Sequence, residues 1–352
     1  MSKFSESLDK GSQDNLELES LRSHKRKSQG EIQRLSAELA EVKKTLDTTE
    51  NILGTSLEPP SWMSPSKPKS SSATIKVILS DTHFDEVVNP EEVDGLNAYN
   101  REIAELRLEK WAQNVVKVAR HYLSGVKYDG LVLSLGGDIF SGDIHEELKE
   151  TNADTILGSL LHWSEHIAAA IGLLQSEFKK IHVVSVVGNH GRMSRKPRAK
   201  LRAKTNFDWL LAKMLERHWR DSDLVTFQIP DGADALVKIY NQGHLITHGD
   251  QASGGGGIGG VWPPIMRLRA RKAQRYLAVG ENFKTMWCGH WHQLVQTPGL
   301  IVNGSLKGAD EYSFINNFGY EQPQQAFAIV TPENNITIQA PIFCQDRKKE
   351  GW

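Results

Sequence analysis

Five apolar stretches of the chain each end abruptly in residues that can bind a metal ion. The stretches are short and rich in valine, isoleucine and leucine, which is typical of buried strands. They run into Asp81-Thr82-His83, Gly136-Gly137-Asp138, Gly188-Asn189-His190, His248-Gly249 and Gly289-His290-Trp291-His292. In open α/β sheets, ligands bind beyond the carboxyl ends of the strands. We therefore expect these five polar ends to converge on one site.

Two long segments with helical spacing of apolar residues separate the first three strands. They cover roughly residues 97–123 and 154–178. In the second, the positions expected to face inward are Leu157, Leu160, Leu161, Ile167, Ala170, Ile171 and Leu174. Further strands are expected at 300–302, 326–330 and 336–338. The alternation of strand and helix predicts a layered α/β domain.

The N-terminal part of the chain carries a different pattern. Apolar residues recur at alternating intervals of three and four at Ile32, Leu35, Leu39, Val42, Leu46 and Leu53, with Thr49 in the remaining position. This spacing is typical of a coiled coil. Residues 32–53 would then form a homo-oligomer or bind a partner helix, and the alternative is a helix packed on the protein's own body.

The pattern divides the chain into four parts. Residues 1–54 form the helical coiled-coil segment, and residues 55–73, with four prolines among serines and lysines, form an extended linker. The compact α/β domain would cover 74–342. The charged tail, 343–352, is expected to be loose.

Composition indicates the cellular compartment of the protein but does not identify a partner. The formal net charge is -1, and the chain has two cysteines, too few for a disulfide framework. We find neither a signal peptide nor an apolar run long enough to cross a membrane. The expectation is a soluble protein of a reducing cytoplasm with no membrane partner, in which Cys288 is packed in its strand.

The polar ends form an oxygen- and nitrogen-rich ligand set without sulfur. Its members are Asp81, His83, Asp138, Asn189, His248, His290 and His292. Such ligands suit a pair of divalent transition ions, and one carboxylate can bridge both. Two ions that share a hydroxide can attack phosphorus and stabilise the leaving oxygen. The predicted reaction is therefore phosphoester hydrolysis.

The order of these motifs resembles that of the calcineurin-like metallophosphoesterase superfamily. The resemblance covers roughly residues 75–302, and it implies a layered αββα sandwich with a dinuclear site on loops at one end. It also implies two divalent ions, with manganese favoured and iron, zinc or nickel as alternatives. The chain is similar to phage and bacterial members, which implies the cytoplasm of a bacterium or of a phage-infected host.

The resemblance assigns a role to each residue of the set. Asp81, His83 and His292 would bind the first ion, Asp138 would bridge, and Asn189, His248 and His290 would complete the second. His190 would be catalytic and would stabilise charge in the transition state or protonate the leaving oxygen. The family usually has an acidic residue after this histidine to orient it, whereas this chain has Gly191. We considered Asp85 as a substitute for that residue.

A basic stretch directly follows His190. Seven of the thirteen residues from Arg192 to Lys204 are basic, and none is acidic. Such a run can bind a phosphate backbone by displacing counterions, although a solvated surface is the simpler interpretation. We expect substrate contacts from Arg192, Arg195, Arg198 and Arg202, with nucleic acid as the partner. The Gly137-Asp138-Ile139-Phe140 motif is similar to the DNA-repair exonuclease branch of the superfamily.

The preferred function is thus a phosphodiesterase or nuclease. The alternatives are a phosphatase for a protein or small phosphomonoester, and a non-catalytic adaptor that binds partners through its coiled coil.

Two smaller features are not part of this functional prediction. His162 and His166 are expected to be a helix-surface pair, because the remaining ligands of a metalloprotease motif are missing. Lys307 would contact a phosphate or lie in a plain surface turn.

Overall fold

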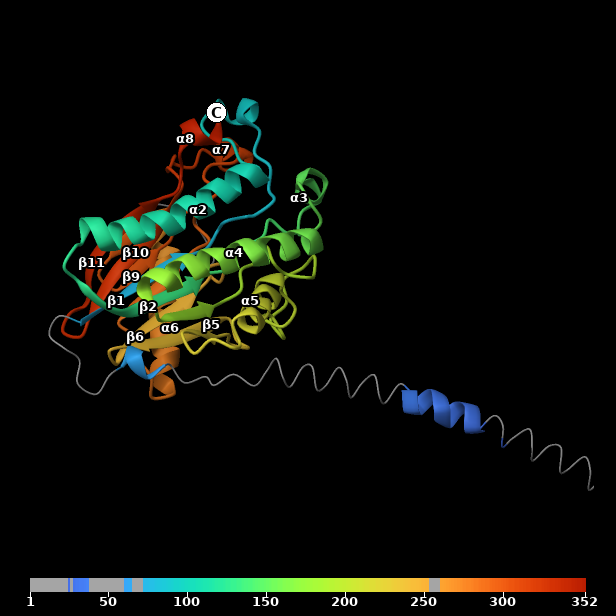
Figure 1. The fold of residues 1–352 in the computed structure, drawn as a ribbon. Helices are drawn as coiled ribbons and strands as arrows, with labels where there is room; N and C mark the ends of the chain where they lie inside the picture. Colours follow the sequence, from blue (N-terminus) through green and yellow to red (C-terminus); the bar gives the residue numbers. More distant parts are fainter. Residues whose placement is uncertain (1–24, 26–27, 38–59, 65–71, 253–259) are drawn as a thin grey trace, which may run out of the picture. The chain divides into compact units, whose positions relative to one another are not determined.

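The predicted strands form two sheets that pack face to face. In the computed structural model, the described residues are 25, 28–37, 60–64, 72–252 and 260–352. The chain divides into two units, residues 1–55 and 56–352, and each is described by itself. Figure 1 labels the elements of the second unit.

The first sheet has six strands in the order β11-β10-β1-β2-β3-β4. Its strands are β1 (Ser72–Leu79), β2 (Lys127–Leu135), β3 (Ile181–Ser185), β4 (Val225–Gln228), β10 (Gln324–Thr331) and β11 (Asn335–Phe343). Strands β1 to β4 are parallel, so their carboxyl ends lie at one edge. Strands β10 and β11 pair antiparallel with their neighbours.

The second sheet has five strands in the order β5-β6-β7-β9-β8. They are β5 (Asp234–Ile239), β6 (Gln242–Thr247), β7 (Thr285–Cys288), β8 (Val295–Thr297) and β9 (Leu300–Val302). Strands β6, β7 and β9 are parallel. The carboxyl ends of β6 and β7 therefore also lie together.

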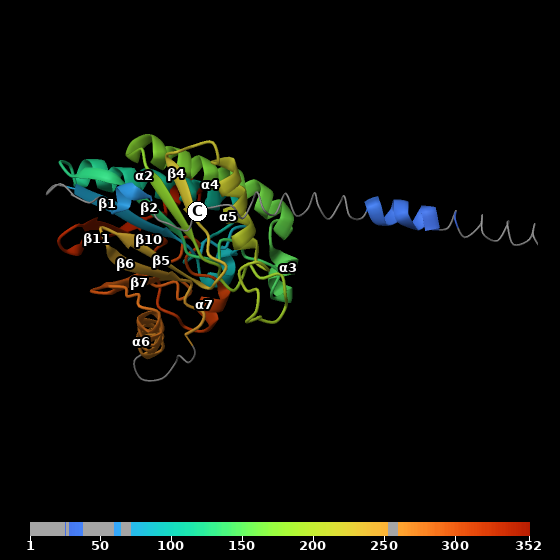
Figure 2. The same cartoon turned by 90° about the horizontal axis from the view of Figure 1, so that it is seen from below.

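Helices cover both outer faces of the sandwich (Figure 2). The helices are α2 (Arg101–Lys117), α3 (Glu146–Thr151), α4 (Ile156–Phe178), α5 (Phe207–His218), α6 (Trp262–Ala278), α7 (Glu311–Ile315) and α8 (Arg347–Glu350). Helix α2 continues as a π-helical turn, η3 (Val118–Tyr122), and two short 3-10 turns are η1 (Ser61–Met63) and η2 (Pro90–Val93). Helices α2, α4 and α5 lie on the six-stranded sheet, and α6 lies beyond the five-stranded sheet.

Three apolar clusters hold these layers together because side chains alternate across a strand. On β1, Val77 and Leu79 face the cluster under the helices, whereas Ile78 faces the cluster between the sheets. A third cluster joins the second sheet to α6 through Ile265 and Leu268. The αββα fold class expected from the sequence is confirmed.

Two of the leucines expected to face inward on α4 are instead exposed. Leu157 is 60% and Leu161 64% exposed, and this part of the prediction is wrong. The core face of the helix runs through Leu160, Trp163 and Ile167, all of them buried. A residue one position after Leu160 is rotated by about 100° on a helix of 3.6 residues per turn, so Leu161 points away.

Part of the predicted linker is packed on the domain. Met63 is fully buried, and its carbonyl accepts a hydrogen bond from the Tyr240 amide at 2.6 Å. Residues 60–64 therefore belong to the folded body, and the first strand begins at Ser72 rather than Thr74. The rest of the linker lies outside the described residues.

Only the first part of the predicted coiled coil is described. Residues 28–37 are helical, and the two heptad residues among them, Ile32 and Leu35, are 62% and 53% exposed. Residues 38–53 lie outside the described residues, so the coiled coil stays a prediction.

The chain's two cysteines are buried and unpaired, which confirms the expectation for Cys288. Among the described helices, none is both long and apolar enough to cross a membrane.

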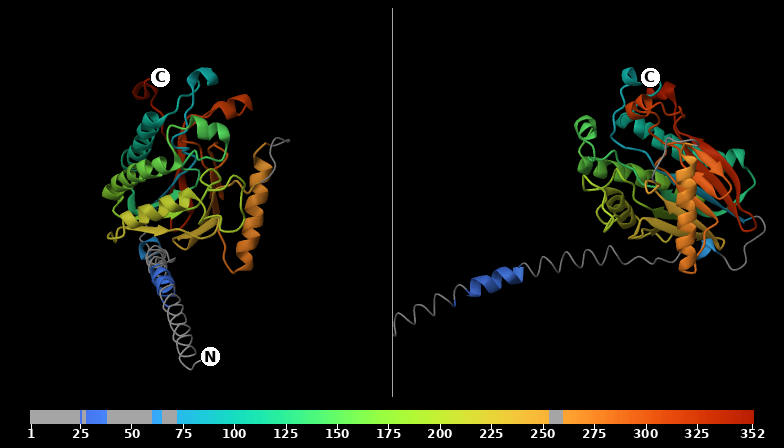
Figure 3. Two further views of the ribbon diagram at one scale, coloured as in Figure 1. Left: turned by 90° about the vertical axis from the view of Figure 1, so that its right-hand side faces the viewer. Right: turned by 180° about the vertical axis from the view of Figure 1, so that it is seen from behind.

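The C-terminal tail is docked rather than loose, which corrects the prediction. Figure 3 shows the C-terminus beside the body of the domain. The Arg107 guanidinium of α2 donates to both carboxylate oxygens of Glu350, at 3.2 and 2.9 Å. Both side chains are almost fully buried. The charged residues of the tail suggested a loose segment, because the partner of Glu350, Arg107, lies 243 residues away in the sequence.

We predict that Glu350→Gln lowers the free energy of unfolding by about 3 kcal/mol, because it leaves a buried guanidinium without its counter-charge. Urea unfolding measures the change. The control is Glu333→Gln, an exposed residue whose substitution should have little effect. Equal stability of the two variants would contradict the importance of the Arg107–Glu350 pair.

Candidate metal centre

The five polar strand ends meet at the edge where the two sheets face each other. Strands β1, β2 and β3 supply the segments carrying Asp81, Asp138 and His190, and strands β6 and β7 supply those of His248 and His290. Three groups of neighbouring side chains result, and within each the ligand atoms lie within 4.8 Å of one another. The groups are Asp81 with His83 and His292, Asp138 with His248 and His290, and His83 with Asp138 and His190. The predicted convergence is therefore observed.

The backbone at this site is held in an unusual conformation. Asp81, His83, Asp138, His290 and His292 all have positive φ angles between 45° and 71°. Such angles cost on the order of 1–3 kcal/mol per residue for residues other than glycine, so the surrounding contacts must enforce them. Hydrogen bonds between the loops do so: the Asp81 amide donates to Gly137, and the His83 amide donates to Asp138, at 3.1 and 3.2 Å.

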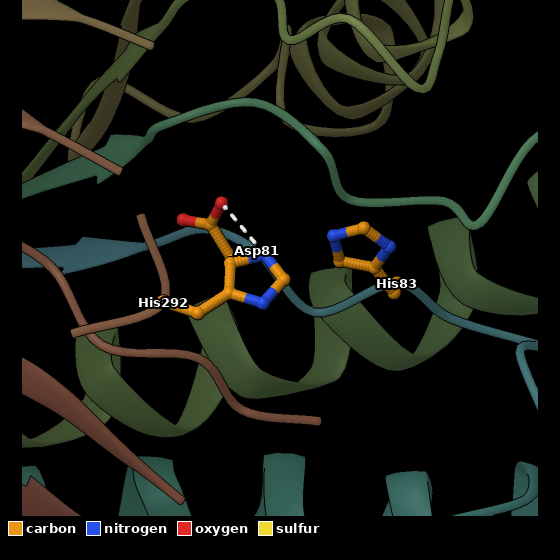
Figure 4. A group of neighbouring side chains, drawn as sticks. All are labelled: Asp81, His83 and His292. Carbon is orange, nitrogen blue, oxygen red and sulfur yellow. Dashed lines mark ion pairs between the residues drawn. The ribbon is translucent and has the colours of Figure 1, made fainter. Parts of the chain in front are cut away.

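The first group is drawn in Figure 4. His292 Nε2 lies 3.5 Å from Asp81 Oδ1, and the rings of His83 and His292 are 4.9 Å apart at their centroids. Asp81 Oδ1 also accepts a hydrogen bond from the His290 amide at 2.7 Å. The three side chains come from the loops after β1 and β7 and lie next to one another.

The second group centres on Asp138. His248 Nε2 lies 2.9 Å from Asp138 Oδ2, and the amide of His190 donates to Asp138 Oδ1 at 2.7 Å. On the other side of the imidazole, His248 Nδ1 lies 2.9 Å from the Gly136 carbonyl, which can only accept. In the neutral form of the ring, that nitrogen carries the proton and the lone pair of Nε2 faces the site.

Unpartnered atoms support a fit between this site and metal ions. Among the described residues, His83 Nε2 and Asn189 Oδ1 are buried and have no hydrogen-bond partner. Nearly all buried polar atoms in folded proteins are paired, so such atoms need an explanation. Imidazole nitrogen, amide oxygen and carboxylate are the donors that divalent transition ions accept. The residues present therefore fit such ions.

Burial dominates the protonation behaviour of the site. It raises the pKa of Asp81 to about 7 and lowers the pKa values of His83 and His290 to about 4. Burial alone would also lower the pKa of His248, but the negative charge of Asp138 raises it to about 10. The Asp138 carboxyl has a pKa well below its usual range, despite its burial, because His248 and His190 face it. His83 and His290 are thus neutral near pH 7, which is the form that binds a metal.

His190 stands at the edge of this site, and its ring centroid lies 4.4 Å from that of His83. Its Nδ1 lies 2.8 Å from the carbonyl of Ser141. A backbone carbonyl thus orients the ring, where the sequence analysis looked for an acid. His145 lies farther out, with a centroid distance of 6.2 Å from His190.

Asp85 does not orient His190, so that expectation is wrong. Its carboxylate is buried and accepts hydrogen bonds from Arg101 Nε at 2.6 Å, Trp163 Nε1 at 3.0 Å and the Ser159 hydroxyl. These contacts tie the loop after β1 to α2 and α4. The carboxylate is therefore already occupied by structural partners.

Packing explains why glycine follows His190. A Cβ atom at Gly191 would lie 2.4 Å from Asn206 Oδ1 and 3.0 Å from Asp208 Cγ. No acidic side chain fits in that space. Asn206 and Asp208, at the start of α5, occupy it instead.

Asp208 is a supporting residue that sequence reasoning missed. Its buried carboxylate accepts from the amides of Asp138 and Gly188, at 3.1 and 2.9 Å, and from that of Ile139 at 3.2 Å. One side chain thus joins the loops after β2 and β3, which carry Asp138 and Asn189. The sequence did carry one signal of a helix start here, because asparagine is a common N-cap residue. Asn206 is the N-cap of α5, and its Oδ1 accepts a hydrogen bond from the Asp208 amide at 2.8 Å.

Glu86 is a second supporting residue. Its Oε2 lies 3.0 Å from His83 Nδ1, while its Oε1 accepts from Lys307 Nζ at 2.7 Å. Burial would raise the pKa of Glu86, but the Lys307 charge lowers it to about 2. A carboxylate on the far nitrogen of a ligating histidine fixes the ring and makes it a better ligand. Lys307 itself is buried and paired with Glu86 and Asp310, so neither expectation for it, phosphate contact or surface turn, is correct.

The basic stretch is only partly free. Arg195 pairs with Glu146 at the surface at 2.8 Å, and Arg202 makes two 2.8 Å contacts to the carboxylate of Asp250. Arg192 donates to the Asn189 carbonyl at 2.8 Å. Arg192, Arg198 and Arg202 line a small open pocket together with Asn189. The four predicted substrate contacts therefore come directly after Asn189 and His190 in the sequence. Three of them, Arg192, Arg195 and Arg202, already have partners within the protein.

No family model matches the chain, and no curated protein matches it. Among solved structures, the chain is similar to a conserved uncharacterized protein, a predicted phosphoesterase, from Streptococcus pneumoniae TIGR4. The identity is 11%, the match covers 76% of this chain and 97% of the other, and the TM-score is 0.28.

Two further solved structures are similar to the chain. One is a Staphylococcus aureus protein, provisionally a 5'-nucleotidase, in complex with alpha-ketoglutarate, at 8% identity, with 78% of this chain and 55% of the other covered and a TM-score of 0.33. The other is the Thermus thermophilus sulfate thiohydrolase SoxB in complex with glycerol, at 12% identity, with 78% and 56% covered and a TM-score of 0.30. The chain spans just over half the length of these two proteins. Likeness at this level carries no argument about its chemistry, which depends on its own residues.

We predict that Asp208→Asn weakens metal binding by about 10- to 100-fold, because an amide group cannot accept all three backbone hydrogen bonds that position Asp138 and Asn189. Titration of the metal-free protein with Mn²⁺ measures the affinity. Asp223→Asn, an exposed residue beyond the end of α5, is the control. Unchanged affinity in Asp208→Asn would show that the two loops hold their geometry without it.

Proposed function

We propose that the chain is a metal-dependent phosphoester hydrolase, with two divalent ions at the centre formed by the strand ends. The observation that carries this proposal is the joining of two three-residue ligand groups through the group of His83, Asp138 and His190. Asp81, His83 and His292 would hold one ion, while Asn189, His248 and His290 would hold the other. Asp138 would lie between them. When bound, two such ions make a water molecule a stronger nucleophile and stabilise charge on phosphate oxygens.

The residues around the ions have separate tasks in this mechanism. The Gly136 carbonyl holds Nδ1 of His248, so release of the proton from Nε2 would put this ring in the ligating form when an ion binds. His190 is held at Nδ1 by the Ser141 carbonyl, so its Nε2 is the atom available to the substrate. In the protonated form this nitrogen can donate to the leaving oxygen. Burial of Asp81 and Asp138 excludes water and strengthens the attraction between carboxylate and cation.

Within this class we favour a phosphodiester substrate. One small pocket is lined both by Asn189, a candidate ligand, and by Arg192, Arg198 and Arg202 of the basic stretch, and basic side chains next to the candidate centre suit a chain of phosphates. A small phosphomonoester needs no such extension. The pairing of Arg202 with Asp250 and of Arg195 with Glu146 reduces the free charge, so Arg198 is the central member of this contact surface.

We predict that the metal-stripped protein is inactive and that added Mn²⁺ restores hydrolysis of a bis-aryl phosphate diester in preference to its monoester. His190→Ala should lower turnover by about 100-fold or more while metal content is unchanged, because general acid catalysis contributes on this order. Chromogenic release measures the rate, and His218→Ala, an exposed histidine on α5, is the control. Preference for the monoester would favour a phosphatase, and metal binding without turnover on either compound would favour a non-catalytic adaptor.

A nucleic-acid substrate is tested separately. We predict that changing Arg195, Arg198 and Arg202 together to Ala weakens DNA binding and lowers the slope of log affinity against log salt by up to about three. The slope is measured by fluorescence anisotropy at several salt concentrations. The control changes Arg217, Arg220 and Lys179, all exposed, to Ala and removes the same charge. Equal weakening in both variants would mean that only net charge matters and would contradict a specific basic surface.

A further inference from the structure

A fourth group of metal-ligating side chains lies outside the candidate metal centre, on the helical layer. It comprises Glu105 of α2 and His162 and His166 of α4, and their ligand atoms lie within 4.8 Å of one another. Helices α2 and α4 run side by side on the outer face of the six-stranded sheet (Figure 1). All three side chains are accessible, with exposed fractions of 27–37%.

The sequence supplied two of these ligands but not the third. Histidines four residues apart on a helix lie on the same face, which is a spacing that can hold a metal ion. The sequence analysis set this pair aside because no further ligand was apparent. Packing of α2 against α4 brings in Glu105, which is 57 residues away along the chain.

The distance between Glu105 and His166 suits one ion between the three residues, whereas that between Glu105 and His162 is a hydrogen bond. Glu105 Oε1 lies 2.9 Å from His162 Nε2 and 3.6 Å from His166 Nε2. Ligands held about 2.0–2.2 Å from a tetrahedral ion are about 3.3–3.6 Å from each other. The separation from His166 is longer than a hydrogen bond, so a direct contact between the side chains does not account for its position.

The His166 ring has the tautomer that ligation needs. Its Nδ1 lies 3.0 Å from the carbonyl of His162, which can only accept a hydrogen bond. Nδ1 must therefore carry a proton, and in the neutral form of the ring the lone pair lies on Nε2, which faces Glu105. A second hydrogen bond of this kind is typical of histidines that bind metals.

We propose that Glu105, His162 and His166 form a separate binding site for a single divalent transition ion of the zinc class. Two imidazoles and one carboxylate are ligands typical of zinc, whereas magnesium and calcium prefer oxygen alone. The accessibility of the group leaves the fourth position to water. The ion would replace the hydrogen bond between His162 and Glu105 and cross-link α2 to α4.

The location gives such an ion a structural consequence. Trp163, next to His162, stacks on Phe84 with ring centroids 3.7 Å apart, and its indole nitrogen donates to Asp85 at 3.0 Å. Phe84 and Asp85 directly follow His83. A cross-link between α2 and α4 therefore holds the helix against which the first ligand loop packs.

The test measures bound Zn²⁺ per chain after dialysis, in the full-length protein. We expect Glu105→Gln and His166→Gln each to bind one ion per chain fewer than the wild type. Zinc should also raise the melting temperature of the wild type more than that of either variant. The control is His121→Gln, because His121 is an exposed histidine of η3 on the same helical layer. Two variants on different helices guard against loss of folding in one of them.

This site does not depend on the proposed function. If the strand-end centre binds no zinc, the wild type should hold one ion and His166→Gln none. If it binds two, the counts should be three and two. Equal zinc content in Glu105→Gln, His166→Gln and His121→Gln would overturn the proposal.

Discussion

The structure depends on keeping two carboxylates and several imidazoles buried together at the ends of five strands. Asp81 and Asp138 are almost fully removed from water, and polar groups surround each carboxyl. The amides of His290 and His190 donate to them at 2.7 Å. The loops adopt left-handed backbone angles to bring these amides into place. These backbone angles cost conformational energy, so they persist only where contacts with the surrounding structure hold the loops in place.

That support extends outward through buried charges. His83 contacts Glu86, Glu86 contacts Lys307, and the carbonyl of Lys307 accepts a hydrogen bond from Arg107. Arg107 then pairs with Glu350 at the C-terminus. Buried charged groups thus connect the candidate metal centre to the last helix, and the carboxylates of Glu86 and Glu350 compensate the charges of Lys307 and Arg107. On the other side, Asp208 holds the loops of Asp138 and Asn189 through backbone amides alone.

The same packing separates two kinds of metal-ligating groups. The candidate centre at the strand ends is buried on supported loops at the edge where the two sheets face each other, which suits the catalytic ions that we propose. The group on α2 and α4 is accessible and joins two helices, which suits a structural ion. Both use histidines whose far nitrogen is hydrogen-bonded to a backbone carbonyl, as seen in His248 and His166. The difference between them is therefore one of burial and support, since the ligand types are the same.

The sequence by itself determined the layered fold class, eight of the eleven described strands and the candidate ligand residues that follow five of them, because these depend on local pattern. Strands β4, β5 and β8 were not predicted. Apolar runs and the residues at their ends can be read in order along the chain, and parallel strands bring their carboxyl ends together. Only the tertiary structure decided which residues support the site. Asp208 lies 70 residues from Asp138, Lys307 lies 221 from Glu86, and Glu350 lies 243 from Arg107. The space beside Gly191, the partners of Asp85 and the approach of Glu105 to His166 also depend on packing between distant segments. No periodicity encodes such contacts, because they arise when separate elements meet and not within any one of them.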